Sequence, residues 1–411
     1  MSFGKRLRVA RQSAGQTQAE LGAAVDVSNS YIAHLETGRR APNPELVERL
    51  EESLGLEPGT LGAPEEWSPS GRKRQLKATL LANFEQAVLL RESGSTVDMV
   101  PQLNAIIEDA RLQGQRDLVW LACRMRVESE MDAGAIDAAS QHAVELLEMA
   151  RKTNDSTLTA VAETKCASLE RLKGNEAAAR SHGAAAVIAS MRDGVSREHR
   201  ADALCAAIAA GGAQVAEWAT MLRTIYPTLD VGSMKGRTAW VLANVAFADE
   251  DIDEGLRWQD EASRHLTPAG QFRSWVKWPA VAAQVRVNVG VLDGVADLLE
   301  EARVRVALSA SDEEMAGLAA SEARYLVAIK DRESARRVLL EALESLEVGV
   351  ASRGHLRLEL SEVAAADGDL AEASAAALSA AKLFTEAGSL REAQKAFEQW
   401  TALQPTASAC V

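Results

Sequence analysis

The stretch TQAELGAAVDVSNSYIAHLETGRRAPNPELVERLEESLG, residues 17–55, carries start and stop signals for short helices. Thr17 and Glu20 have the spacing of a capping box, Ser28 is a second N-cap, and Gly38 is a typical helix end. Working outward from these signals, we expect helices at 4–15, 18–25, 29–38 and 45–55, then a brief fifth turn at 58–61. Short helices with only three residues between the second and the third are typical of a helix-turn-helix.

The composition predicts an all-α protein with more than one domain. The chain has 411 residues, of which 47% are hydrophobic, only 4% are aromatic and 10 are proline. The four cysteines are far apart, which predicts reduced thiols rather than a zinc site or a disulfide framework. Because no signal peptide and no stretch of roughly 18 apolar residues is found, we expect a soluble, cytoplasmic protein without a membrane partner.

The charge is distributed unevenly along the chain. The net charge is −14, yet residues 1–75 contain equal numbers of basic and acidic residues, so the rest of the chain carries the whole excess. The first 40 residues contain six bases and three acids. Since phosphate repels an acidic surface, only the N-terminal region is expected to touch nucleic acid.

The sequence beyond residue 75 repeats with a period of about 39 residues. Polar, turn-like breaks recur near Gly94, Gly134, Gly174, Gly212, Asp251, Gly290, Lys330 and Gly368. Units of this length, each with two helices, are typical of an α-solenoid. We expect a DNA-binding domain at 1–62, a linker at 63–75, repeats at 76–403 and a tail at 404–411.

The N-terminal stretch resembles the lambda-repressor-like, or Xre, helix-turn-helix family over residues 3–62. TQAEL, the I-x-x-L-E-x-G stretch and the basic residues after it occur in the family's order. The resemblance implies binding to double-stranded DNA, with the helix at 29–38 in the major groove. By position, it implies DNA contacts from Thr17, Gln18, Ser28, Asn29, Ser30, His34, Arg39 and Arg40.

The resemblance also implies separate roles for these residues. Gln18 would hold a phosphate, and Ser28 and Arg39 would contact the backbone. Asn29 would read adenine and His34 a guanine acceptor, whereas Glu36 would be structural. The alternative is a capped helical bundle whose surface Asn, Ser and His side chains do not contact DNA.

The repeats are similar to tetratricopeptide repeats over residues 76–403, although the family's usual unit is shorter, at about 34 residues. Ala139, Ala178, Gly255 and Ala373 stand where that family has a small residue that lets helices approach closely. Such repeats behind an Xre domain resemble the peptide-sensing quorum regulators of Gram-positive bacteria. This resemblance implies a homodimer on a palindromic operator, with a short peptide or small-molecule effector on the concave side of the repeats.

The concave wall of a solenoid is built by the first helix of each unit, which suggests where an effector would bind. The candidate ligand-binding residues are Arg237, Trp240, Asn244, Lys277, Gln284, Asn288 and Arg324. Asn and Gln pair with peptide bonds, and Arg or Lys holds a carboxylate. The alternative is that the tryptophans fill gaps between helices and the polar residues are solvated.

The sequence shows no motif for catalysis, such as a glycine-rich phosphate loop, H-E-x-x-H or G-x-S-x-G. We therefore expect no enzyme, no cofactor and no metal. The favoured hypothesis is a sequence-specific DNA-binding transcription regulator whose effector controls DNA binding by a dimer. One alternative is a protein-interaction scaffold that the N-terminal domain anchors to DNA. Another is an N-terminal domain that dimerises without binding DNA.

Overall fold

The computed structural model describes residues 2–62, 69–92, 99–268, 272–309 and 311–404, and these contain helices and no strand. The all-α prediction is confirmed. The chain divides into two compact units, residues 1–86 with 105–119 and residues 87–104 with 120–411. The first four helices are α1 (Phe3–Ser13), α2 (Gln18–Ala24), α3 (Asn29–Glu36) and α4 (Pro44–Ser53).

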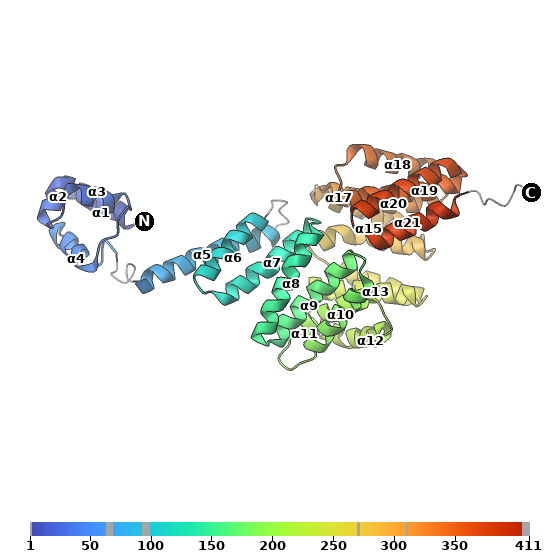
Figure 1. Cartoon of the computed structure of the whole chain (residues 1–411), viewed down its shortest axis with the longest axis horizontal. Coiled ribbons are helices and arrows are strands. Elements are labelled where there is room, and N and C mark those ends of the chain that lie inside the picture. The colour runs from blue at the N-terminus through green and yellow to red at the C-terminus, as the bar shows by residue number, and fades with distance from the viewer. Residues whose placement is uncertain (1, 63–68, 93–98, 269–271, 310, 405–411) are drawn as a thin grey trace, which may run out of the picture. The chain divides into compact units, whose positions relative to one another are not determined.

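The remaining helices follow one another along the chain (Figure 1). They are α5 (Pro69–Glu92), α6 (Val100–Leu112), α7 (Arg116–Asp132), α8 (Ile136–Thr153), α9 (Ser156–Leu172), α10 (Glu176–Ser190), α11 (Arg197–Ala210), α12 (Val215–Ile225), the 3-10 helix η2 (Tyr226–Thr228), α13 (Ser233–Ala248), α14 (Ile252–His265), α15 (Phe272–Asn288), α16 (Val295–Ser309), α17 (Asp312–Ala328), α18 (Arg332–Ser345), α19 (Val350–Asp367), α20 (Leu370–Glu386) and α21 (Leu390–Ala402).

Side-chain caps fix the starts of the N-terminal helices. The capping box of α2 is complete: Glu20 N donates to Thr17 Oγ1 at 3.2 Å, and Thr17 N donates to Glu20 Oε2 at 2.7 Å. At α3, Tyr31 N donates to Ser28 Oγ at 3.1 Å. The glycine after α3, Gly38, has φ +72°, which suits the end of a helix. The short helices predicted from these signals are therefore confirmed.

Two glycines let α3 lie directly on its neighbours. A Cβ atom at Gly4 would lie 2.5 Å from the carbonyl oxygens of Leu35 and Glu36, at the end of α3. A Cβ atom at Gly22 would lie 2.8 Å from the carbonyl oxygen of Val27, just before α3 begins. The core beneath these contacts is aliphatic and fully buried, with Leu7, Leu21, Ile32, Leu35 and Leu50 at its centre. The position of α3 is thus fixed at both ends.

The second unit is built in two layers of helices. The odd-numbered helices pack side by side, α9 on α11 and α11 on α13, and likewise α15 on α17 and α17 on α19. The even-numbered helices pack on these, as α10 does on α9 and α20 on α19 (Figure 1). Rows of first helices covered by second helices are typical of a helical solenoid, as expected from the sequence period.

The predicted breaks separate the two helices of each unit. Gly134, Gly174 and Gly368 have φ of +75°, +75° and +83°, a left-handed conformation that glycine adopts at low cost. At two breaks this conformation falls on other residues, Glu250 (φ +62°) and Lys330 (φ +69°). The predicted break at Gly94 lies outside the described residues. Of the predicted linker, 63–68 also lies outside them, while α5 begins within it at Pro69.

A small buried residue lies five positions after the left-handed residue at five of the breaks, those at Gly134, Gly174, Glu250, Lys330 and Gly368. Ala139 and Ala373 have no exposed surface, and Gly255 is buried on the ring of Phe247. In the unit of α9 and α10, the buried residue is Ala179 and not Ala178, which is half-exposed. The sequence-based register of that unit was therefore wrong by one residue, because three successive alanines, residues 177–179, do not show which of them is buried.

Adding a side chain at Gly255 is expected to destabilise the solenoid. Its Cβ atom would lie 2.6 Å from the ring of Phe247, so Gly255→Val should cost about 1–3 kcal/mol through overpacking. Gly317→Val is the matched control, since no atom lies within 4 Å of a Cβ atom there. Urea unfolding followed by circular dichroism should show a lower midpoint for the first variant only. If the unfolding midpoint falls equally in both variants, the destabilisation comes from the change in helix propensity and not from overpacking.

The described cysteines, Cys123, Cys166 and Cys205, are buried. Burial raises the pKa of Cys166 to about 12, with the charges of Glu163 and Glu170 adding to the shift, and burial raises the pKa of Cys205 to about 11. A thiol with such a pKa reacts slowly at neutral pH.

The fourth cysteine, Cys410, lies outside the described residues. With Cys410 replaced by serine, we therefore expect the native protein to react with a disulfide reagent only after unfolding. The measurement is the absorbance of the released thiolate, with and without denaturant. Rapid reaction of the native protein would show that at least one of these sites opens to solvent.

Candidate functional site

One face of α3 is free of internal packing. Asn29 and Ser30 are exposed, and His34 is half-exposed one turn later, whereas Ile32 and Leu35 are completely buried. Since residues four apart share a helix face, Ser30 and His34 lie together. Among the described residues, no hydrogen bond is found for the side chains of Asn29, Ser30 or His34. These donors and acceptors are therefore available to a partner.

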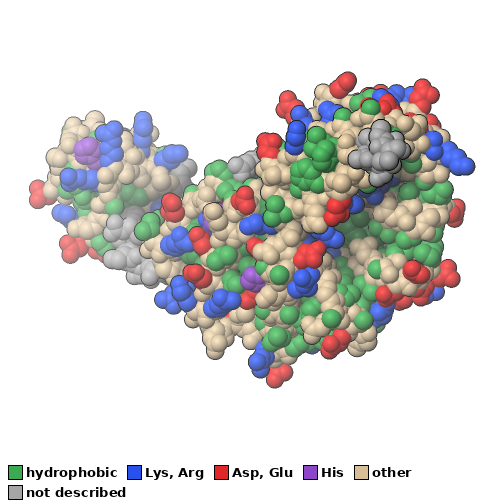
Figure 2. Space-filling view, turned by 45° about the vertical axis from the view of Figure 1, so that its right-hand side comes forward, with side chains coloured by type: hydrophobic (Ala, Val, Ile, Leu, Met, Phe, Trp, Pro, Cys, Tyr) green, Lys and Arg blue, Asp and Glu red, His purple; other side chains and the backbone are tan. Residues whose placement is uncertain are grey.

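Basic side chains flank this face. Arg39 and Arg40 are exposed, and their backbone N–H groups donate to the carbonyl oxygen of His34 at 2.9 and 3.3 Å. The guanidinium of Arg40 lies 5.6 Å from the centre of the Tyr31 ring, a cation–π contact. Figure 2 shows Lys and Arg side chains gathered beside a histidine on the N-terminal unit. The turn after α3 thus holds two cations next to the free face.

The side chains of Arg11, Gln18 and Glu36 form a hydrogen-bonded network that links α1, the start of α2 and the end of α3. Arg11 Nε donates to Glu36 Oε1 at 2.5 Å, and Gln18 Nε2 donates to Glu36 Oε2 at 2.8 Å. The side chains of Arg11 and Glu36 are only 11% and 4% exposed. The structural role expected for Glu36 is therefore confirmed. An amide nitrogen carries two hydrogens, so Gln18 can still offer its second one to a phosphate.

The same network sets the charge state of its members. Burial alone would raise the pKa of Glu36, but the hydrogen bonds from Arg11 and Gln18 and the charges of Arg11 and Arg8 outweigh it and hold the pKa below its ordinary value. The hydrogen bond to Glu36 raises the pKa of Arg11. Both groups are thus ionised near neutral pH, and Gln18 is held by a carboxylate.

Sequence reasoning missed Arg8 as a candidate contact. It is exposed on α1, and its charge acts on Glu36, the carboxylate that also accepts a hydrogen bond from Gln18 of α2. The available signal was its spacing: Arg8 stands three residues before Arg11 and therefore on the same face of α1.

The predicted ligand-binding residues do not gather at one place. Gln284 and Arg324 line a cavity, and Arg324 Nη1 donates to Asn288 Oδ1 at 3.3 Å. Arg237 is paired with Asp202 at 2.6 Å. Trp240 packs edge-on against Trp278, with 5.2 Å between ring centres, which fits the alternative that tryptophans fill gaps. Asn244 and Lys277 are exposed and do not line the cavity.

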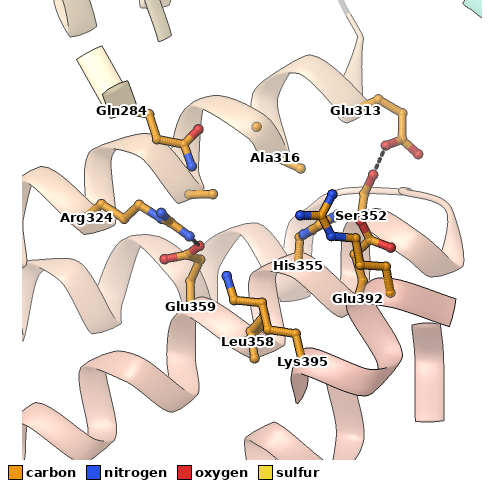
Figure 3. Close-up of a pocket in the computed structure, with 13 residues that line it drawn as sticks. Gln284, Glu313, Ala316, Arg324, Ser352, His355, Leu358, Glu359, Glu392 and Lys395 are labelled. Carbon is orange, nitrogen blue, oxygen red and sulfur yellow. Dashed lines mark hydrogen bonds and ion pairs between the residues drawn. The ribbon is translucent and has the colours of Figure 1, made fainter. Parts of the chain in front are cut away.

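The cavity lies between α15, α17, α19 and α21 and has a volume of about 420 Å³ (Figure 3). Arg324 Nε donates to Glu359 Oε1 at 2.7 Å across α17 and α19. His355 packs on Phe384 with 4.8 Å between ring centres, and burial lowers its pKa, so the ring is neutral near neutral pH. Sequence reasoning missed His355 and Lys395, because only the packing of α19 and α21 brings them to Arg324.

The N-terminal geometry agrees with known domains. Residues 2–62 match the family model of the helix-turn-helix domain. Residues 2–62 are a helix-turn-helix domain. An HTH-type transcriptional regulator of Mycobacterium tuberculosis and one of Mycobacterium bovis are each 41% identical over 59 residues, which cover 14% of this chain and 23% of the relative. The endothelial differentiation-related factor 1 homolog of chicken is 32% identical over 74 residues, or 18% of this chain and 50% of that protein.

Each of these matches covers less than a fifth of this chain, and the chain spans about a quarter of the length of the mycobacterial regulators. In the part of the chain that the structure describes, no helix is long and apolar enough to cross a membrane. Within the same residues, no group of three or more His, Cys, Asp or Glu side chains is placed to hold a metal ion.

Proposed function

We propose that the protein is a transcription regulator that binds double-stranded DNA in a sequence-specific manner through its helix-turn-helix domain. The observation that carries this proposal is the free face of α3, where Asn29, Ser30 and His34 are unengaged beside the cations Arg39 and Arg40. In this reading α3 enters the major groove and the flanking residues hold phosphates. Thr17, Gln18 and Ser28, at the starts of α2 and α3, contact the backbone.

We further propose that the solenoid binds an effector, a short peptide or a small molecule, and that a homodimer reads a palindromic operator. The cavity around Arg324 supports the first part, because its polar lining faces an open space. An effector can change DNA binding only if it binds two arrangements of the protein with different affinities. A change in solenoid curvature that alters the spacing of two helix-turn-helix domains would provide such a difference.

The test is selection of bound sequences from a random DNA library with the full-length protein. Enrichment of one palindromic motif is the expected result, and its loss or gain after addition of a cell extract would support effector control. If no motif is enriched in either condition, the regulator proposal is wrong, and a scaffold held together by the solenoid becomes the better explanation.

Arg39 provides a separate check on how the domain holds DNA. If it contacts phosphate, Arg39→Gln should weaken binding to all sequences alike and reduce the slope of log affinity against log salt by about one. Fluorescence anisotropy at several salt concentrations measures both. Glu48→Gln, at an exposed position on α4, is the control. A loss confined to one DNA sequence would instead assign Arg39 to base recognition.

A further inference from the structure

The cavity between α15, α17, α19 and α21 is lined by charges of both signs, and most of them are already engaged. Arg324 is paired with Glu359. Glu313 accepts hydrogen bonds from the hydroxyl of Ser352 and, at 2.6 Å, from Gly349 N. Arg391 lies 3.5 Å from Glu176. Two lining charges remain: the ammonium of Lys395 and the carboxylate of Glu392.

Lys395 and Glu392 have no ion-pair partner among the described residues, and one carboxylate oxygen of Glu392 is buried without a hydrogen bond. They stand three residues apart on α21, so both side chains lie on one face of that helix. The charges of both act on His355, which places both near the imidazole (Figure 3). The cavity thus presents a cation and an anion that form no ion pair among the described residues, close to a neutral ring. The charge of Glu392 also acts on Arg171, and that of Lys395 on Glu359.

The opposite wall leaves room for a ligand. It is formed by Ala316, Gly317 and Ala320 of α17, and no atom lies within 4 Å of a Cβ atom built at Gly317. The amide of Gln284 has no hydrogen-bond partner within the described ranges and can both donate and accept. A volume of about 420 Å³ falls at the small end of the range for ligand sites.

We propose that this cavity binds a small zwitterion of amino-acid or dipeptide size, with its carboxylate on Lys395 and its ammonium on Glu392. Each ligand charge would meet a protein charge that forms no ion pair among the described residues, while Gln284 and His355 would bind the polar groups between them. This ligand class specifies the effector proposed above. Only the effect of the ligand on DNA binding rests on the proposed function; the binding itself does not.

The test is isothermal titration of the full-length protein with each proteinogenic amino acid and with a series of alanine-containing dipeptides. At least one probe is expected to bind. Lys395→Met and Glu392→Gln should each lower the affinity for that probe by about ten-fold or more. Lys382→Met, at an exposed position on α20, is the matched control and should leave the affinity unchanged. Circular dichroism melting of each variant shows whether the fold is retained.

The ligand itself provides a second readout that does not depend on variant stability. Acetylation of the amino group of the binding probe should lower its affinity for the wild-type protein. The same acetylation should lower the affinity for Glu392→Gln only a little further, because that variant has already lost the contact. Methylation of the carboxylate should behave likewise with Lys395→Met. If the affinity losses from the ligand modification and from the matching variant add fully, the two groups do not contact each other and the proposal is wrong. Binding of longer peptides alone, or of no probe, would also overturn it.

DNA binding is measured in parallel by anisotropy, so that the two proposals can fail separately. Sequence-specific DNA binding without binding of any zwitterion overturns the cavity assignment and leaves the regulator standing. Binding of a zwitterion by a protein that selects no DNA motif overturns the proposed function and leaves the cavity assignment standing.

Discussion

Replacing Arg11 by methionine is expected to destabilise the helix-turn-helix domain by about 3–5 kcal/mol. The change removes the only cation that donates to the buried carboxylate of Glu36 in the described structure, and an unpaired buried charge is costly. Gln18 alone would remain as a donor, and its position at the start of α2 would loosen. Hydrogen exchange of the amides in α2 and α3 measures the loss.

Arg8→Met is the matched control for this variant. Arg8 also acts on Glu36, but it is exposed and donates no hydrogen bond to it in the described residues, so a change within about 0.5 kcal/mol is expected. The exchange of amides in the solenoid should stay the same in both variants. If Arg11→Met leaves the protection of α2 and α3 intact, the ion pair contributes nothing to holding α3.

The same carboxylate makes the domain sensitive to acid. The folded-state pKa of Glu36 lies below its unfolded value of about 4.3, so its ionised form stabilises the domain fully above that pH. This contribution is lost as the pH falls through the folded value. The protection of α2 and α3 should therefore fall below about pH 4 in the wild type. Glu36→Gln should lack this component of the pH dependence.

Asn29→Ala is expected to reduce affinity for the selected DNA motif by about 1–3 kcal/mol, if the amide pairs with an adenine. The side chain is exposed and unengaged on the first turn of α3, so its removal costs the fold little. Its effect on unrelated DNA should be small. Anisotropy titrations with the motif, with the motif changed at one base pair, and with unrelated DNA separate these terms.

Gln18→Ala provides the contrast. A phosphate contact is independent of sequence, so this variant should weaken binding to all three DNAs alike. Gln12→Ala, at an exposed position on α1, should change none of them. Equal losses on every DNA from both Asn29→Ala and Gln18→Ala would contradict the role assigned to Asn29 and would place α3 on the backbone.

Local signals were sufficient to predict the helices of the first domain. Caps such as Thr17 and Ser28 act on backbone groups two or three residues away, so their effect can be read without the fold. The solenoid period was likewise visible, because left-handed turns at Gly134 or Gly368 impose a local conformation. Register was harder where alanine repeats, since Ala178 and Ala179 differ only in the neighbour that each meets.

The sites depended on contacts that no local signal encodes. The pairing of Arg11 with Glu36 joins residues 25 apart, and the cavity joins Gln284 to Lys395 across four helices. Helical periodicity places Gln284 on the inner layer, but it does not say which side chains of α19 and α21 come to meet it. For this reason only part of the predicted ligand-binding set lies at the cavity.

The close contacts of Gly4 and Gly22 limit what an effector can alter. They hold both ends of α3 against backbone atoms, so this helix has no room to tilt or slide within its domain. If the domain moves as one rigid piece, a signal from the solenoid changes how often an operator is occupied and leaves the base preference intact. We therefore expect the same consensus sequence with and without effector, at different protein concentrations.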